Sequence, residues 1–143
     1  MAPLKETKVV TCFLKRRQQG HDEILLLRRS QHVGTYRGRW AGVSGYLEAP
    51  PHEQALKEIG EEAGLGPDEV TLVRKGKPLA VVDEGLGRRW LIHPYLFEVR
   101  HPEKIAIDWE HTEARWIKPE DMASYKTVPG LKEALEAVYP ETV

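Results

Sequence analysis

The sequence predicts one α/β domain, and its length, its composition and its alternation of strand and helix patterns favour that class. The chain has 143 residues, a length at which a single hydrophobic core usually closes. Hydrophobic residues make up 41% of the chain and charged residues 30%, which is typical of a globular protein rather than a disordered or membrane-embedded one. We therefore expect residues 1–143 to form a single domain.

The chain begins with segments that favour extended structure. Runs of β-branched and aliphatic residues at Lys8–Phe13 and Glu23–Leu27 predict paired strands, joined by a hairpin connection over the polar segment Lys15–Asp22. The polar, glycine-containing segment Ser30–Arg39 predicts a loop, which leads into a short stretch at Trp40–Tyr46. Charged loops of this kind often face substrates.

A helix is expected over Pro51–Ala63. Apolar residues such as Ala55 and Ile59 recur there at helical spacing, a proline begins the segment and Gly64 follows its end. The rest of the chain returns to strands and then to helix. The patterns predict strands at Val70–Val73, Leu79–Val82, Trp90–Val99 and Ala114–Ile117, a helical turn from Pro119, and an amphipathic helix that begins near Pro129.

The charge balance and the cysteine count limit the partners and the compartment. Lys and Arg number 21 against 22 Asp and Glu, so the net charge of −1 gives no global field for nucleic acid or an anionic membrane. Cys12 is the single cysteine and lies in an apolar run, which predicts a small buried thiol in a reducing compartment. The chain starts without the apolar core of a signal peptide, so we expect a cytoplasmic protein. A homodimer is left open.

Three carboxylates gather on the first helix. Glu58, Glu61 and Glu62 are spaced i, i+3 and i+4 and therefore share one face, where like charges repel unless a cation compensates them. Mg²⁺ prefers carboxylate and carbonyl oxygens and commonly binds phosphate groups at the same time, so the spacing favours diphosphate chemistry. A solvated, glutamate-rich helix face has the same spacing, and the spacing alone leaves both interpretations open.

Other catalytic chemistries find no support in the sequence. The six histidines show no paired spacing of the kind that binds zinc. Covalent catalysis is not expected either, because Cys12 lies in an apolar strand and no Gly-x-Ser-x-Gly pattern is present.

Two neighbouring segments carry a family resemblance. Gly45–Glu48 followed by Lys57–Leu65 resembles the Nudix box of MutT-type hydrolases, and the second segment fills every place of the family run except the first, where Lys57 replaces an arginine. The first segment departs from the pattern. It lies two residues closer to the helix than is usual, and Ala49 stands at the position of the first glutamate of the box, for which Glu48 is a candidate substitute.

The resemblance implies a fold, an activity and a metal site. The fold would be an α/β/α sandwich with a mixed, curved sheet between helices. The activity would be Mg²⁺- or Mn²⁺-dependent hydrolysis of a diphosphate linkage in a nucleoside diphosphate derivative or a nucleoside triphosphate, a small-molecule substrate. By resemblance, Glu58, Glu61, Glu62 and the carbonyl of Ser44 would hold the metal. Either Glu58, which we favour, or Glu110 would accept the proton of the attacking water.

Substrate contacts are expected from the charged loop and its borders. Arg28, Arg29 and Arg39 are candidates for phosphate binding, with Arg29 the first choice, and Trp40 could stack on a base or belong to the core. Two other functions stay open. One is a Nudix domain that binds a nucleotide or sugar nucleotide as a sensor without cleaving it, and the other is an isomerase acting on an isopentenyl diphosphate, which would need Cys12 at the reacting carbon.

Overall fold

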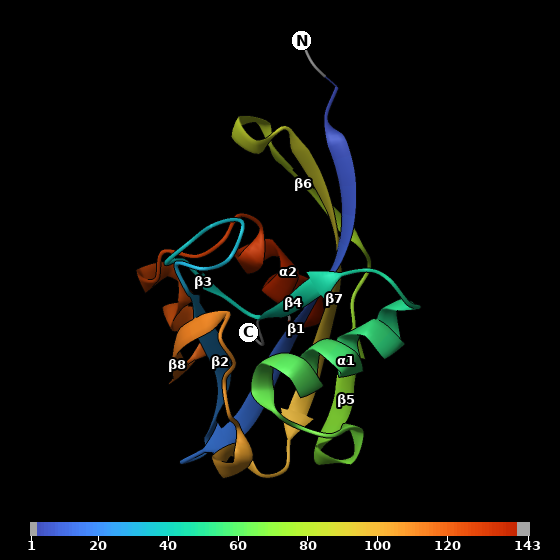
Figure 1. Ribbon diagram of the computed structural model, residues 1–143. Coiled ribbons are helices and arrows are strands. Elements are labelled where there is room, and N and C mark those ends of the chain that lie inside the picture. The colour runs from blue at the N-terminus through green and yellow to red at the C-terminus, as the bar shows by residue number, and fades with distance from the viewer. Residues whose placement is uncertain (1–2, 140–143) are drawn as a thin grey trace.

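The computed structural model describes residues 3–139 and has one mixed sheet with a helix on each face (Figure 1). The sheet is eight-stranded, with the order β3-β2-β1-β7-β5, while β4 pairs with β1, β6 with β7 and β8 with β2. The strands are β1 (Lys5–Gln18), β2 (His21–Arg29), β3 (Trp40–Ala41), β4 (Val43–Tyr46), β5 (Val70–Lys75), β6 (Leu79–Asp83), β7 (Arg88–Val99) and β8 (His111–Ile117). The α-helices are α1 (Pro51–Ala63) and α2 (Leu131–Val138), and short 3₁₀ turns lie at Pro67–Glu69, Glu84–Leu86, Pro102–Lys104 and Pro119–Ser124.

The centre of the sheet is the pair β1 and β7, which run parallel from the partners Lys5 and Arg88 to the partners Lys15 and Glu98. The other pairs of strands are antiparallel, so the sheet is mixed. Together with the helices on both faces, this arrangement confirms the predicted α/β/α sandwich.

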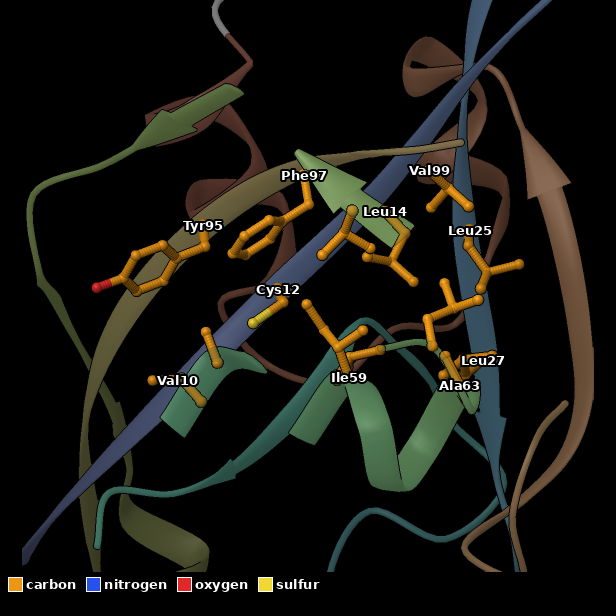
Figure 2. Packing of buried hydrophobic residues seen from close by; sticks show 14 residues of the cluster. Val10, Cys12, Leu14, Leu25, Leu27, Ile59, Ala63, Tyr95, Phe97 and Val99 are labelled. Atoms are coloured by element: carbon orange, nitrogen blue, oxygen red, sulfur yellow. The ribbon is translucent and has the colours of Figure 1, made fainter. Parts of the chain in front are cut away.

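Successive residues of β1 face opposite sides of the sheet and belong to two hydrophobic cores. Val10, Cys12 and Leu14 face α1, where Ile59 and Ala63 of the helix point back toward the sheet (Figure 2). Phe13 belongs to the second core, which α2 covers. A period of two is the expected pattern for a strand that is buried on both faces. The buried position of Cys12 confirms the prediction of a core thiol.

Helix α1 has the predicted bounds, Pro51–Ala63, and its end is set by Gly64, whose φ of 72° provides a left-handed cap. The predicted hairpin connection over Lys15–Asp22 is wrong in extent, because β1 and β2 continue to a tight turn at Gln19 and Gly20. Ion pairs across the two strands stabilise the polar extension. Polarity alone therefore does not mark where these strands end.

The β6–β7 hairpin and the first residues of β1 extend beyond α1 as a protruding part of the sheet (Figure 1). Within residues 3–139, no helix is long and apolar enough to cross a membrane.

Candidate active site

Helix α1 lies beside β4, and its Glu58 side chain occupies the space next to Gly45 of the strand. The Glu58 carboxyl group rests against Gly45, and a Cβ atom built on Gly45 would fall inside that carboxyl group. The contact fixes the Glu58 side chain against the start of the segment that carries the family resemblance. Glycine at this position leaves room for the Glu58 carboxyl group and does not serve an unusual backbone angle.

Glu58 is also held by a residue of its own helix. Gln54, which is one turn earlier and 1% exposed, donates from Nε2 to Glu58 Oε2 over 2.9 Å. The Gln54 side-chain oxygen accepts from the Glu48 backbone N–H over 3.0 Å. Gln54 therefore links the loop that precedes α1 to the carboxylate that the helix presents.

The three helix carboxylates differ in burial. Glu58 and Glu62 are buried, whereas Glu61 is exposed and lines the cavity described below. Burial, with nearby Glu110 as the next cause, raises the pKa of Glu62 to about 10, and burial also raises the pKa of Glu58. Glu62 Oε1 lies 3.3 Å from the Ser44 backbone N–H, while Oε2 is buried with no hydrogen-bond partner within residues 3–139.

A second acidic segment precedes β8. Asp108 and Glu110 line the same cavity, and burial, followed by the charge of Asp108, raises the pKa of Glu110. His111 is buried behind them. Its Nδ1 lies 3.1 Å from Asp108 Oδ1 and its Nε2 lies 3.7 Å from Glu62 Oε1, so the imidazole bridges the two acidic segments.

The donor chemistry of this cluster fits a hard divalent cation. The cluster offers carboxylate oxygens, Glu62 Oε2 is a buried acceptor without a partner, and the pKa values of Glu58, Glu62 and Glu110 are all raised. Within the described residues, however, the side chains do not bring three or more His, Cys, Asp or Glu residues together at one point. Mg²⁺ is commonly held by one or two carboxylates together with water and phosphate oxygens, so a cation would not need all three helix carboxylates at one point.

The cavity beside the carboxylates has a volume of about 600 Å³, a size typical of small-molecule sites. Its floor is a face of the sheet, where Tyr46, Val9 and Ile92 are register partners on three neighbouring strands. Trp90 extends this floor along β7, and Val128 and Pro129 also line the cavity. One part of the cavity is therefore acidic and another is apolar and aromatic.

Arg29 is the predicted phosphate-binding residue that lines the cavity. Its Nε donates to the Thr35 carbonyl oxygen over 2.9 Å, and its Nη2 lies 3.3 Å from Thr35 Oγ1. These bonds hold the loop 30–39 against the end of β2 and fix the guanidinium near Glu110, whose pKa it lowers through its charge.

The structure does not bring the other predicted substrate contacts to the cavity. Arg28 is 48% exposed at its side chain and donates to the Gly38 carbonyl oxygen, and Arg39 donates to the Thr127 carbonyl oxygen. Trp40 is 8% exposed and packs edge-on against Tyr125 at 5.3 Å between ring centroids, so it belongs to the second core. Lys57 lines the cavity but forms no ion pair within the described residues, and it acts on Glu58 through space.

Several residues of the site were not predicted from the sequence. Gln54 could have been found, because it lies four residues before Glu58 on the same helix face. Tyr36, Trp90 and Asp108 could not, because the loops and strands that carry them meet only in the folded chain.

The mixed sheet between two helices, with an acidic cavity at its side, defines an α/β fold of the mixed-sheet class. Residues 5–138 match the NUDIX domain family, and the chain belongs to that family. The predicted resemblance is thus confirmed. No curated protein sequence matches the chain.

Solved structures with the same fold include the following three. The C. elegans Ap4A hydrolase, in a binary complex, has a TM-score of 0.76 at 19% identity, over 92% of this chain and 93% of that one. The MutT protein from Methanosarcina mazei Go1 has a TM-score of 0.72 at 20% identity, over 95% and 94% of the two chains. The NUDIX domain of Shewanella oneidensis NrtR, complexed with ADP ribose, has a TM-score of 0.72 at 14% identity, over 96% and 86%.

Proposed function

We propose that this protein is a divalent-metal-dependent hydrolase that cleaves a diphosphate linkage in a nucleoside diphosphate derivative or a nucleoside triphosphate. One observation carries the proposal. The buried, uncompensated carboxylates of α1 adjoin a cavity of about 600 Å³ that also contains an arginine and an apolar floor. Such a cavity offers separate places for a cation, for phosphates and for an uncharged group. Family membership supports the same class of substrate, and so do two structural neighbours, an Ap4A hydrolase and a NUDIX domain complexed with ADP ribose.

Glu58, Glu61 and Glu62, with the carbonyl of Ser44, would hold Mg²⁺ or Mn²⁺. When bound, the cation supplies charge neutralisation at the diphosphate and lowers the pKa of water. Glu58 is positioned by Gly45 and Gln54, and Glu61 faces the cavity from one turn further along the helix. The chain itself therefore fixes the direction in which the carboxylates point.

Two carboxylates are candidates for the general base. Glu58 is fixed by packing and by a hydrogen bond, whereas Glu110 lies in the segment before β8, near the guanidinium of Arg29. A base must lie within hydrogen-bond reach of the water that it deprotonates, and both side chains line the cavity. We favour Glu58 because its position is fixed by more contacts.

Arg29 would bind the phosphates. Its Nε and Nη2 face Thr35, and within residues 3–139 its Nη1 has no hydrogen-bond partner. A guanidinium that is already held in place loses less side-chain entropy when it binds an oxyanion.

A non-catalytic nucleotide-binding function is the second candidate. The carboxylates do not converge on one point in the described residues, and Ala49 stands at the position of the first glutamate of the box. A NUDIX domain of known structure, that of Shewanella oneidensis NrtR, is complexed with ADP ribose. These three observations favour binding without cleavage. In that case ligands would bind in the cavity and stay intact.

The test is product release from a panel of nucleoside triphosphates, ADP-ribose, dinucleoside polyphosphates and sugar nucleotides, with Mg²⁺ and then with EDTA. We expect metal-dependent release of phosphate, diphosphate or a nucleoside monophosphate from one class. Changing both Glu61→Gln and Glu62→Gln should abolish turnover and preserve the fold, as circular dichroism would show. Glu53→Gln is the matched control, because Glu53 is an exposed glutamate of α1 that does not line the cavity.

Full turnover in the double variant would contradict the proposal. If no class is cleaved but a ligand raises the melting temperature, the binding function is supported instead, since a ligand that binds only the folded state stabilises it.

A further inference from the structure

The loop 30–39 reaches across to the β6–β7 hairpin through a single side chain. Tyr36 donates from its hydroxyl to Asp83 Oδ2 over 2.7 Å, and the same hydroxyl accepts from Trp90 Nε1 over 3.0 Å. Asp83 is fixed in turn, because its Oδ1 accepts from the Leu86 backbone N–H over 3.2 Å. The loop is thereby tied to a hairpin almost fifty residues further along the chain.

The backbone of Tyr36 adopts a conformation that large side chains seldom adopt. Its φ is 49°, in the left-handed region, where a residue with a Cβ atom is disfavoured. Such a conformation persists only when its surroundings hold it. Here the two hydrogen bonds of the hydroxyl and the neighbouring Trp90 ring, at 6.3 Å between centroids, supply those surroundings.

Tyr36 and Trp90 line the cavity far from the helix carboxylates. Along β1, Ser44 of the acidic part is the register partner of Thr11, whereas Trp90 is the partner of Thr7. Four residues of strand separate these two rows by roughly 13 Å. The acidic part and the Tyr36–Trp90 part are therefore different ends of one cavity.

The lining of the second end of the cavity suits an uncharged planar group of a ligand. The Tyr36 hydroxyl is already engaged as donor and acceptor, so the residue presents its ring rather than a free polar atom. Trp90 has its single donor engaged in the same way. Ile92, Val128 and Pro129 complete the lining, and a Cβ atom built on Gly130 would clash with Val81, so a side chain at that position would meet the hairpin.

We infer that Tyr36, locked by Asp83 and Trp90, is a specificity-determining residue whose ring forms the end wall of the cavity and holds the nucleobase of the substrate. The inference rests on the proposed function for the class of ligand. It adds the orientation, with phosphates toward Arg29 and the α1 carboxylates and the base against Tyr36 and Trp90. Aromatic rings bind bases by stacking, which a sugar phosphate alone cannot exploit.

The test measures binding of ligands without a diphosphate linkage, so that it does not depend on turnover. The probes are AMP, GMP, CMP and UMP, compared with ribose 5-phosphate by isothermal titration calorimetry with Mg²⁺. We expect at least one nucleotide to bind about tenfold more tightly than ribose 5-phosphate. Tyr36→Ala should reduce this preference to about twofold or less, because the ring is gone.

Tyr36→Phe keeps the ring and removes the hydroxyl, so the preference should fall by roughly threefold as the ring loses its fixed position. This variant also provides the test if Tyr36→Ala does not fold. Tyr139→Phe is the matched control. It removes a tyrosine–aspartate hydrogen bond of 2.9 Å, to Asp22, outside the cavity, and the preference should stay at the wild-type value.

Equal binding of ribose 5-phosphate and all four nucleotides would overturn the inference, and so would a folded Tyr36→Ala protein with full preference. The two proposals fail differently. If the protein prefers a nucleotide and the preference depends on Tyr36, but nothing is cleaved, the inference stands and the proposed hydrolysis fails. If the protein cleaves a diphosphate, but wild type and Tyr36→Ala show the same preference, the proposed hydrolysis stands and the inference fails.

Discussion

The two ends of the cavity differ in how well the protein satisfies its own polar groups. At the acidic end, Glu62 has a buried oxygen without a partner in the described residues, and its pKa is raised to about 10. At the aromatic end, the Tyr36 hydroxyl has a donor and an acceptor, and Asp83 and Trp90 are engaged with it. An unpaired buried carboxylate is costly, whereas a paired network adds rigidity. The comparison indicates that one end leaves a buried oxygen free for a ligand to engage and that the other end is already formed.

The largest expected effect comes from filling the close contact at the acidic end. Gly45→Ala would place a methyl group where the Glu58 carboxyl group lies, so the carboxylate or the helix must move. Because a displacement of about 1 Å can cost roughly 100-fold in rate, we expect turnover to fall by at least that factor. Steady-state kinetics on the substrate found in the panel would check it.

Gly34→Ala is the control for this substitution, since a Cβ atom at Gly34 meets nothing within 4 Å. It lies in the loop 30–39 and should leave turnover near the wild-type rate. Near-normal turnover in Gly45→Ala would mean that Glu58 does not need its present position.

The second expected effect is on stability and follows from the raised pKa of Glu62. In EDTA, the folded protein keeps a proton on Glu62 up to a pH of about 10, whereas the unfolded chain releases it near the ordinary value of 4.5. Because the folded state binds more protons between these values, the free energy of unfolding falls as the pH rises through that window. Glu62→Gln removes this dependence, and we expect the variant to be about 1–3 kcal/mol more stable than wild type at pH 8 without metal.

Thermal unfolding of both proteins from pH 5 to pH 9, with EDTA and with Mg²⁺, would measure this difference. Mg²⁺ should raise the melting temperature of the wild type more than that of the variant, since only the wild type has a carboxyl group at this position that can release its proton and bind the cation. Parallel pH curves for wild type and Glu62→Gln would show that Glu62 titrates normally, and Glu53→Gln is expected to give such a parallel curve.

The same contrast explains what the sequence could predict. Three carboxylates of the acidic end lie on one helix, and the 3.6-residue period is enough to place Glu58, Glu61 and Glu62 on one face. The strands and helices were predicted for the same reason, because their patterns are local, whereas the mixed sheet between helices was implied by the family resemblance. Local patterns could not predict how deeply each carboxylate is buried, because β4 and His111 bury Glu62, not its own helix.

The aromatic end could not be predicted, because its parts come from a loop, a hairpin and the segment before α2. Tyr36 meets Asp83 and Trp90 only after β6, β7 and the loop 30–39 are in place. Trp40 was a candidate for base stacking because it lies beside the charged loop, but a strand position buries it against Tyr125. Sequence proximity to a loop does not decide on which face of a strand an aromatic residue points.

The smallest expected effect is a difference in KM between variants of two adjacent arginines, Arg28 and Arg29, at the border between the two ends of the cavity. Arg29 lines the cavity and is held by Thr35, whereas Arg28 does not line the cavity and donates to the Gly38 carbonyl oxygen. We therefore expect Arg29, and not Arg28, to bind a phosphate in the cavity. Arg29→Ala should raise KM by about tenfold, the cost of one charge-assisted contact, and Arg28→Ala should change it by less than about twofold. Initial rates over a range of substrate concentrations measure both values. Equal changes in the two variants would mean that the arginines act through the general charge of the loop, and the acidic end would then lack a defined phosphate contact from β2.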